Sequence, residues 1–445
     1  MTKRLSLISF LAVSIMLAML MSLLPVAAQD DAEPTPIVAN LGEGGTPISF
    51  WNGLTGSDGE TLNSMLAEFV AANPDISITA ETVDWNTLYT KLQAAFVAGN
   101  PPDVFILHSA EVPQFGSYGV LADLSSWYST DGGWFPVDDI SSITYSGMLY
   151  DGVPVGIPLD NHVRGLWINT DMFDAAGIST DPATAPTTYE GWVELFQKLT
   201  LDENGNNALS PDFNPEAVVQ WGYTVGEWPR VNFLSSLAQH GGTFFSEDGT
   251  QATFNSEAGI AALQEAADLV YKYHVSPPEA GFDTWQGFAN GSVAVLPTGS
   301  WFRNFSNTLE VNSMAWPQVQ FGAEKGTYMG IHTWMVPNTL SGEKLDAVER
   351  LIQWVSENQV LWAASGQVPA RLSAQAALDA ENYPSNILLG QTAAEYGVLD
   401  PHNAAIQEMY AALDPELSAA LNNLKTPEQA LNDAADRVQQ ILDRQ

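Results

Sequence analysis

The sequence predicts an α/β protein built as two lobes that are joined by extended hinge segments. Strand-like and helix-like segments alternate between residues 48 and 107, which is the order of an α/β layer. The 445 residues are enough for two or three domains of ordinary size with a large core. Segment 153–177 joins a proline-marked extended stretch to three adjacent polar side chains, which is typical of a lobe crossing beside a ligand cleft. The alternative for this segment is an ordinary edge strand and turn.

The N-terminus has the pattern of a secretory signal peptide. Lys3 and Arg4 precede an apolar run over residues 5–24, and the small residues at 26–28 fit a cleavage site. We therefore expect residues 1–28 to be a signal peptide. An uncleaved membrane anchor is the alternative, because the apolar run approaches the length that spans a bilayer.

Charge and cysteine content restrict the partners and the anchoring of the chain. It carries 52 acidic against 15 basic residues, a formal net charge of −37. This balance argues against nucleic acid or an anionic membrane as partner, because both are bound through clustered Lys and Arg. With no cysteine, the chain has no disulfide and no lipid anchor on a cysteine. We expect an exported protein at the periplasmic or extracellular face of the cytoplasmic membrane.

The first elements follow a linker. Residues 29–47 are rich in Pro, Gly and acidic residues without any period, and they predict a disordered linker. Apolar runs and apolar residues at helical spacing then give alternating elements. The strands are predicted at 48–51, 76–78 and 104–107, and the helices at 62–70 and 85–96.

Polar side chains follow the first and third predicted strands. Asn52 and Thr55 lie in a glycine-rich loop after the first strand, and His108 and Glu111 follow the third. Open α/β sheets bind ligands at the carboxyl ends of their strands, so we expect these side chains on one rim. The alternatives are loop capping for the first pair and solvated surface charge for the second. The glycine-rich loop matches neither the G-x-x-x-x-G-K-[ST] nor the G-x-G-x-x-G signature of phosphate-binding loops.

The rest of the chain predicts a second α/β region and a helical C-terminus. Segment 202–213 resembles a calcium loop but lacks glycine at the sixth loop position and an acid at the twelfth, so a plain turn is expected. The six histidines are scattered along the chain, and no metal site or cofactor is predicted. Helices are predicted at 192–199, 233–240 and 260–270, strands at 293–296 and near 330–334, and a mostly helical end from 345, broken at 366–371.

Seven pieces of sequence carry a family resemblance. They are FWNGLTG, FVAANPDI, WNTLYTKLQAAFVAGNPPDV, VPVGIPLDNHVRGLWINTDMF with AAGI, PTTYEGWVELFQKLT, FANGSVAVLPTGSW and GQVPAR, in order across residues 48–371. As an ordered set they resemble the extracellular solute-binding proteins of ABC importers, in the sugar and oligosaccharide family of the maltose-binding type. No single piece is diagnostic.

The resemblance implies a two-lobed periplasmic-binding-protein fold, similar to type II, with the ligand held between the lobes. It places the first lobe at 48–160 plus 318–366 and the second at 161–317 plus 367–445. It also implies a monomer without catalytic activity that delivers a neutral sugar or oligosaccharide to the transmembrane subunits of an ABC permease.

The resemblance also singles out ligand-binding residues. Trp301 follows Ser300 at the end of a predicted strand, where the family carries an aromatic that stacks on a sugar ring; core packing is the alternative. Asp160, Asn161 and His162 lie at the crossing, where relatives contact ligand from the hinge; hinge hydrogen bonds are the alternative. The further candidates are Glu227, Trp228, Arg230, His332, Trp334 and Arg371. The alternatives are core packing for Trp334 and a buried salt bridge for Arg371.

Three other functions stay open. The same fold could bind glycerol phosphate or a related phosphorylated solute, for which Arg164, Arg230, Arg303 and Arg371 are the available cations. A glycoside-active enzyme would need two carboxyl groups across one bond, and the carboxylates available for that role are Glu111, Asp160 and Glu227. A structural surface protein that has kept the fold would bind no solute.

Overall fold

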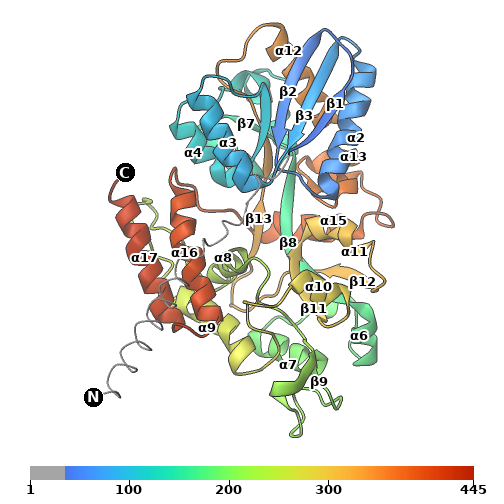
Figure 1. Cartoon of the computed structure of the whole chain (residues 1–445), viewed down its shortest axis with the longest axis vertical. Coiled ribbons are helices and arrows are strands. Elements are labelled where there is room, and N and C mark those ends of the chain that lie inside the picture. Colours follow the sequence, from blue (N-terminus) through green and yellow to red (C-terminus); the bar gives the residue numbers. More distant parts are fainter. Residues whose placement is uncertain (1–35) are drawn as a thin grey trace, which may run out of the picture. The chain divides into compact units, whose positions relative to one another are not determined.

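The computed structural model describes residues 36–445, so the predicted signal peptide lies outside the described residues. Residues 37–445 form one unit that contains two large β-sheets, and each sheet has its own helices and apolar core (Figure 1). We call these halves the first and the second lobe. Within residues 36–445, none of the helices combines the length and apolar character that crossing a membrane requires.

The first lobe is a six-stranded sheet in the order β1-β3-β2-β4-β14-β7. The central strands β3, β2 and β4 are parallel, and β1 and β14 run antiparallel to their neighbours. The predicted alternation of strands and helices up to residue 107 is confirmed. The strands are β1 (Ile37–Leu41), β2 (Thr46–Asn52), β3 (Ile76–Thr82), β4 (Val104–His108), β7 (Gly156–Pro158) and β14 (His332–Met335).

Helices cover both faces of this sheet. Along β4, Val104 and Ile106 face one core, whereas Phe105 and Leu107 face the other, as the two-residue period of a strand requires. The first of these cores contains residues of α2, α12 and α13, and the second contains residues of α3 and α4. The helices are α2 (Ser57–Ala72), α3 (Trp85–Val97), α4 (Val112–Ser117), α5 (Ser142–Ser146), α12 (Glu343–Glu357) and α13 (Gln359–Trp362).

The second lobe is organised around β8 (Asp160–Asn169), all ten residues of which are buried. Its sheet has the order β11-β8-β13-β16, and β12 and β15 also pair with β8. The other strands are β11 (Val295–Gly299), β12 (Ser313–Trp316), β13 (Thr327–Gly330), β15 (Val368–Pro369) and β16 (Gly397–Val398). The helices are α6 (Thr170–Ala175), α7 (Tyr189–Leu199), α8 (Pro229–Gln239), α9 (Glu257–Tyr271), α10 (Thr284–Ala289), α11 (Arg303–Ser306), α14 (Leu372–Ala376), α15 (Pro384–Tyr396), α16 (Ile406–Leu421) and α17 (Pro427–Leu442).

Small two-stranded ribbons complete the fold. They are β5 (Leu149–Tyr150) with β6 (Val153–Pro154), and β9 (Leu201–Asp202) with β10 (Val218–Gln220). Segment 202–213 folds as a turn, in which the Asp202 carboxylate accepts hydrogen bonds from the backbone N–H groups of Asn204, Asn206 and Asn214.

The two lobes are joined where strands pass from one sheet to the other. Leu159 separates β7 of the first sheet from β8 of the second, and Ile331 separates β13 of the second from β14 of the first. These crossings lie side by side, because β8 pairs with β13 and β7 pairs with β14 (Figure 1). The predicted hinge strands are therefore confirmed.

Two predicted boundaries are wrong. The disordered linker was expected to reach residue 47, but β1 pairs with β3 and β2 begins at Thr46. The side chains of β1 are mostly exposed, so this edge strand is held by backbone pairing and leaves no apolar pattern. The return to the first lobe was expected at residue 318, but β13 still pairs with β8, and the chain returns at Ile331.

Candidate functional site

Strand pairing brings three of the six histidines together at the hinge. His108 ends β4 and lies directly opposite His332, the first residue of β14. His162 lies opposite Gly330 on the neighbouring hinge strands β8 and β13. The ring centroids of the three histidines are 4.4–5.1 Å apart. The expectation that the histidines are scattered is therefore wrong in space, although it describes the sequence.

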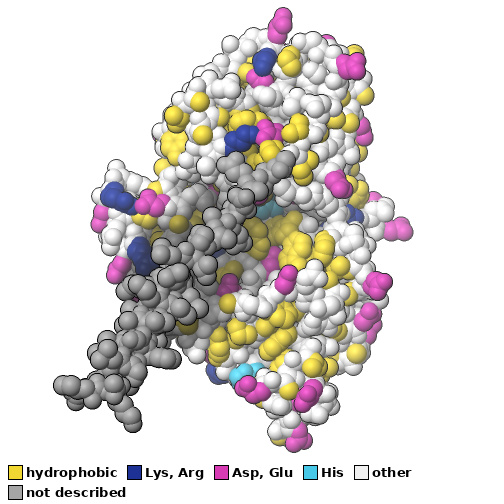
Figure 2. Space-filling view, in the orientation of Figure 1, with side chains coloured by type: hydrophobic (Ala, Val, Ile, Leu, Met, Phe, Trp, Pro, Cys, Tyr) yellow, Lys and Arg dark blue, Asp and Glu magenta, His cyan; other side chains and the backbone are white. Residues whose placement is uncertain are grey.

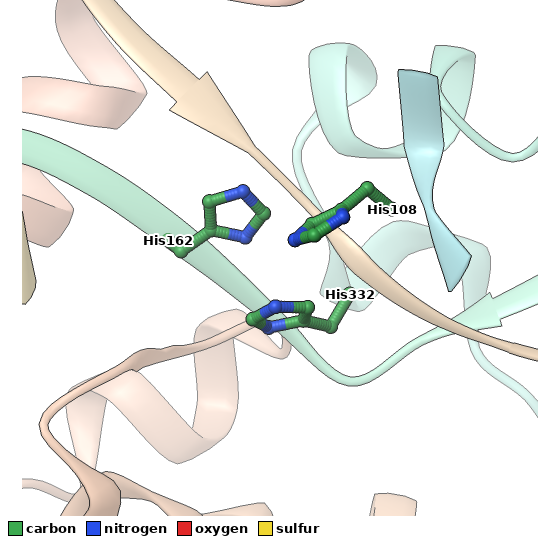
Figure 3. Close-up of side chains that lie close together, drawn as sticks. All are labelled: His108, His162 and His332. Atoms are coloured by element: carbon green, nitrogen blue, oxygen red, sulfur yellow. The ribbon is translucent and has the colours of Figure 1, made fainter. Parts of the chain in front are cut away.

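The three rings face one another. One nitrogen from each ring lies within 4.8 Å of the corresponding nitrogens of the other two, and Figure 3 shows these nitrogens turned toward the gap between the rings. Gly330 gives His162 its space, because a Cβ at residue 330 would lie 1.8 Å from His162 Nε2. The glycine thus permits this position of the ring.

Asp160 holds the histidine cluster through a hydrogen bond to His332. Its fully buried carboxylate accepts hydrogen bonds from His332 Nδ1 at 2.9 Å and from Trp362 Nε1 at 2.8 Å. Burial alone opposes ionisation of this carboxyl group, but the neighbouring His332 and His162 outweigh burial and hold its pKa below the usual value. The Asp160 carboxylate therefore places a negative charge next to the histidines.

Aromatic residues of α3 close the cluster on the side of the first lobe. The Trp85 ring stacks on His332 with a centroid distance of 5.3 Å and an interplanar angle of 10°. The Tyr89 hydroxyl shares a hydrogen bond with His108 Nδ1. Burial, together with the charge of His332, lowers the pKa of His108 well below its usual value, so this imidazole is neutral at neutral pH.

Glu111 makes a direct contact between the lobes. It lies in the short 3-10 helix η1 (Ser109–Glu111) of the first lobe, and it accepts a hydrogen bond from Gln407 Nε2 of α16 in the second. Burial, followed by the charge of Asp400, raises the pKa of Glu111 to about 8. Its carboxyl group is therefore mostly protonated at neutral pH.

The second lobe contributes a wall with exposed aromatic surface. Trp228, at the N-terminus of α8, is 57% exposed, and its ring centroid lies 6.3 Å from that of Trp301. Trp301 in turn lies 6.2 Å from His162, which connects this wall to the histidine cluster. Arg230 pairs with Asp414 at 2.6 Å beside Trp228.

A pocket of about 310 Å³ adjoins this wall, which is within the size range of small-molecule sites. Trp228, Arg230 and Asp414 line it, together with Glu279 and residues of α16. Another cavity lies in the apolar core of the second lobe between α8 and α9, but at about 40 Å³ it has room only for a few waters.

Glu227 lies in a buried ion pair inside the second lobe. Its carboxylate faces Arg164, a fully buried guanidinium group on β8. Arg164 Nη2 also donates to the carbonyl oxygens of Glu227 and Pro297, at 2.6 and 2.7 Å. Thr298 Oγ1 donates to Glu227 Oε1 at 2.8 Å. These bonds give the pair a structural role.

Three further candidates also make internal contacts. The buried Asn52 accepts a hydrogen bond from the backbone N–H of Leu54, which is the contact expected for loop capping. Asn161 accepts one from Thr144, and Ser300 donates to Gln367 at 2.5 Å. Asn161 lies in the hinge strand β8, Ser300 follows β11, and Asn52 ends β2 at the start of the first loop. Thr55 is exposed in that loop.

The structure separates two candidates from the cluster. Trp334 is 1% exposed and packs on Phe50 in the core of the first lobe, with ring centroids 5.1 Å apart. Arg371 pairs with Asp139 at 2.7 Å. The contact of Trp334 matches the core packing stated as its alternative, whereas the salt bridge of Arg371 is partly exposed and not buried.

Sequence reasoning missed several residues of the site. Trp85 and Tyr89 had a signal, because they begin the helix that follows a strand at the predicted rim. Gln407 had none, since it touches Glu111 across nearly 300 positions of sequence. The same holds for Asp400, whose carboxylate accepts hydrogen bonds from Tyr328 and Tyr410 near Arg230.

The chain belongs to the bacterial extracellular solute-binding protein family, whose sequence model matches residues 52–361. Members of this family are the solute-binding components of ABC importers, so the chain is an extracytoplasmic protein that takes a small-molecule ligand and serves an ABC permease. The family and its structural neighbours are binding proteins associated with transport, not enzymes.

Relatives in this family bind different solutes. A lactose-binding protein of Rhizobium radiobacter is 22% identical over 343 residues, covering 73% of this chain and 74% of its own. An sn-glycerol-3-phosphate-binding periplasmic protein of Shigella dysenteriae is 22% identical over 427 residues, covering 90% and 93%.

Solved structures agree on the two-lobed fold. An ABC substrate-binding protein of Listeria monocytogenes in complex with cycloalternan is 25% identical with a TM-score of 0.74, covering 89% of this chain and 99% of its own. Maltose-bound MalE3 of T. maritima has 21% identity and the same TM-score and coverage.

Proposed function

We propose that this protein captures a neutral sugar or oligosaccharide between its lobes, as a monomer, and delivers it to the permease. The observation that carries the proposal is the aromatic wall of Trp228 and Trp301 beside a pocket that also contains polar side chains. Flat aromatic faces pack on the C–H faces of a pyranose, while polar groups at the rim bind its hydroxyls. Relatives named for lactose, cycloalternan and maltose support this ligand class.

The charges of the site support a neutral ligand. A phosphorylated solute needs free cations, above all arginine. Each of the four arginines considered for that role already has an acceptor within the protein, namely Glu227 for Arg164, Asp414 for Arg230, Asn382 for Arg303 and Asp139 for Arg371. Figure 2 also shows many acidic side chains and few basic ones on the visible described surface.

Closure of the lobes provides the capture step. A ligand shifts an open–closed equilibrium only when it binds the closed state more tightly, which requires contact with both lobes. The bond between Glu111 and Gln407 marks where the lobes already meet. Trp85 on the first lobe and Trp301 on the second, on either side of the histidines, are the aromatic faces that we expect the ligand to touch.

A phosphorylated solute is the second candidate. Arg230 Nε is buried without a hydrogen-bond partner, and it adjoins the pocket beside Trp228. This nitrogen and the relative named for sn-glycerol 3-phosphate are the two observations that favour a phosphorylated solute.

Thermal unfolding across a panel of mono- and oligosaccharides, with glycerol 3-phosphate included, tests both candidates. A ligand that binds only the folded state at a hundredfold excess over its dissociation constant adds about 2.7 kcal/mol of stability. We expect a neutral sugar to raise the midpoint, and Trp301→Ala to abolish the rise. Tyr118→Ala, which removes an exposed aromatic from α4's C-terminus, is the matched control and should keep it.

The other outcomes separate the alternatives. A rise with glycerol 3-phosphate alone, lost in Arg230→Gln, establishes the phosphorylated solute. Turnover of a glycoside by the purified protein would establish an enzyme, although Asp160 and Glu227, two of its three carboxylates, are held by His332 and Arg164. No rise with any ligand of the panel supports the structural surface protein.

A further inference from the structure

The histidine cluster has the donor set of a transition-metal site. Imidazole nitrogens are the preferred ligands of zinc, copper and nickel ions, and a zinc ion lies about 2.0–2.1 Å from each nitrogen. Three nitrogens no more than 4.8 Å apart lie at most about 2.8 Å from their common centre, which is 4.8 Å divided by √3. A shift of each ring by less than about 1 Å therefore brings all three nitrogens to bonding distance.

The partners of the outer nitrogens fit the same role. A metal-ligating histidine usually gives its other ring nitrogen to a carboxylate, carbonyl or hydroxyl group, which fixes the tautomer and orients the ring. Asp160 binds Nδ1 of His332, and the Tyr89 hydroxyl binds Nδ1 of His108. Both histidines therefore keep Nε2 for a ligand.

The third histidine supplies an unpartnered buried nitrogen. His162 is 6% exposed, and its Nδ1 has no hydrogen-bond partner among the described residues. The nearest carboxylate oxygen, Oδ1 of Asp160, is 3.7 Å away, which is too far for a hydrogen bond. A buried polar atom without a hydrogen-bond partner destabilises the fold unless something binds it. Figure 3 shows a His162 nitrogen turned toward the other two rings.

The charge around the cluster suits a cation. Asp160 brings a buried negative charge, and a dication above it would be partly compensated.

We propose that His108, His162 and His332 bind one divalent transition-metal ion of the zinc class at the hinge. Three histidines complete three of the four positions of a tetrahedral site, and the fourth stays open to water or to a bound solute. Because His108 and His332 belong to the first sheet and His162 to the second, the ion links the two lobes. This proposal does not rest on the identity of the transported solute.

Metal titration of the purified chain tests the proposal. The chain, prepared without a polyhistidine tag and stripped with a chelator, is titrated with Co²⁺ and followed by visible absorption, and Zn²⁺ then displaces the Co²⁺. We expect one equivalent of Co²⁺ with the spectrum of a nitrogen-rich tetrahedral site. His162→Ala should lower the affinity more than about 100-fold, and Tyr89→Phe, which removes an outer partner, about 10-fold or more.

The controls keep the result decisive. His240→Gln removes a histidine that pairs with Glu265 elsewhere in the second lobe, and it should bind Co²⁺ like the wild type. His108→Gln, at the more exposed edge of the cluster, repeats the test if His162→Ala fails to fold. No Co²⁺ binding by the wild type, or binding that survives both His162→Ala and His108→Gln, overturns the proposal. The sugar panel on the same preparation reports solute binding separately.

Discussion

Two buried polar clusters of this protein use similar residues and differ in where their polar atoms point. In the first, Arg164 and Glu227 face each other, and both also bind groups inside the second lobe. In the second, Asp160 and Tyr89 hold the outer nitrogens of His332 and His108, but the inner nitrogens face one another.

This difference separates a structural cluster from a candidate site. Burial and charge are common to both clusters, so neither property identifies function. Arg164 and Glu227 pair with each other within the folded chain, whereas one nitrogen of each histidine lies close to the other two, and a single external cation could bind all three. The sequence named Glu227 and all three histidines as candidate ligand contacts, but it predicted neither the ion pair with Arg164 nor the meeting of the three rings.

Removal of one charge should break the first cluster. In Glu227→Gln the guanidinium group of Arg164 stays buried without its counter-ion, which typically costs about 3–5 kcal/mol of unfolding free energy. Urea unfolding measures this loss. The double variant Arg164→Met, Glu227→Met is the control, and it should be more stable than Glu227→Gln because no charge remains buried. A loss below about 1 kcal/mol in Glu227→Gln would contradict a structural role.

A methyl group at residue 330 should disturb the second cluster. In Gly330→Ala the new Cβ would lie 1.8 Å from His162 Nε2, so the ring must move, at a cost of about 1–3 kcal/mol. Gly45→Ala is the matched control, because a Cβ there meets nothing within 4 Å. Urea midpoints compare the two variants. Equal midpoints would show that the position of His162 is loosely held.

Removal of one hydrogen bond to Asp160 should weaken the histidine cluster. Trp362→Phe removes the indole N–H that donates to Asp160, and we expect a loss of about 1 kcal/mol beyond that of the smaller ring. Trp192→Phe is the control, because this equally buried indole nitrogen has no hydrogen-bond partner among the described residues. Thermal unfolding of both variants measures the difference. A larger loss of stability in Trp192→Phe than in Trp362→Phe would contradict the stabilising role of the hydrogen bond to Asp160.

The smallest effect is expected for the ion pair of His240 with Glu265, which is partly exposed and lies outside both buried clusters. A hydrogen bond to Glu265 raises the pKa of His240 above 6.5, its ordinary value. A raised pKa in the folded state contributes stability below pH 6.5, and that stability is lost as the pH rises through the folded-state pKa. We expect less than about 1 kcal/mol. Denaturation of wild type and His240→Gln between pH 5 and about 8 should converge at the alkaline end; a gap that widens with pH would contradict this sign.

Local pattern was sufficient to predict the elements and the crossing between lobes. The helical spacing of Leu62, Met65 and Phe69 gave α2, and the continuous apolar run from Val104 gave β4. The alternation of Val155 and Ile157 with glycine and prolines gave the hinge. Each of these signals is confined to neighbouring residues, which is why it survives without knowledge of the fold.

The sequence did not predict how far each residue of a strand lies from the site. His332 and Trp334 point to the same face of β14 because they are two residues apart, and both were candidates for the site. Trp334 extends into the core against Phe50, whereas His332 lies at the end of the strand, where the lobes meet. Only the position of β14 within the sheet distinguishes them.

The sequence by itself thus determined the α/β elements, the hinge and the family, since these follow from local periodicity and from ordered motifs. The tertiary structure decided which polar residues meet. Pairing of β4 with β14 and of β8 with β13 joined three histidines that are 54 and 170 positions apart. Backbone hydrogen bonds between distant strands create such neighbours. Because every non-proline residue carries the same backbone donor and acceptor, these bonds do not show in the sequence which strand pairs with which.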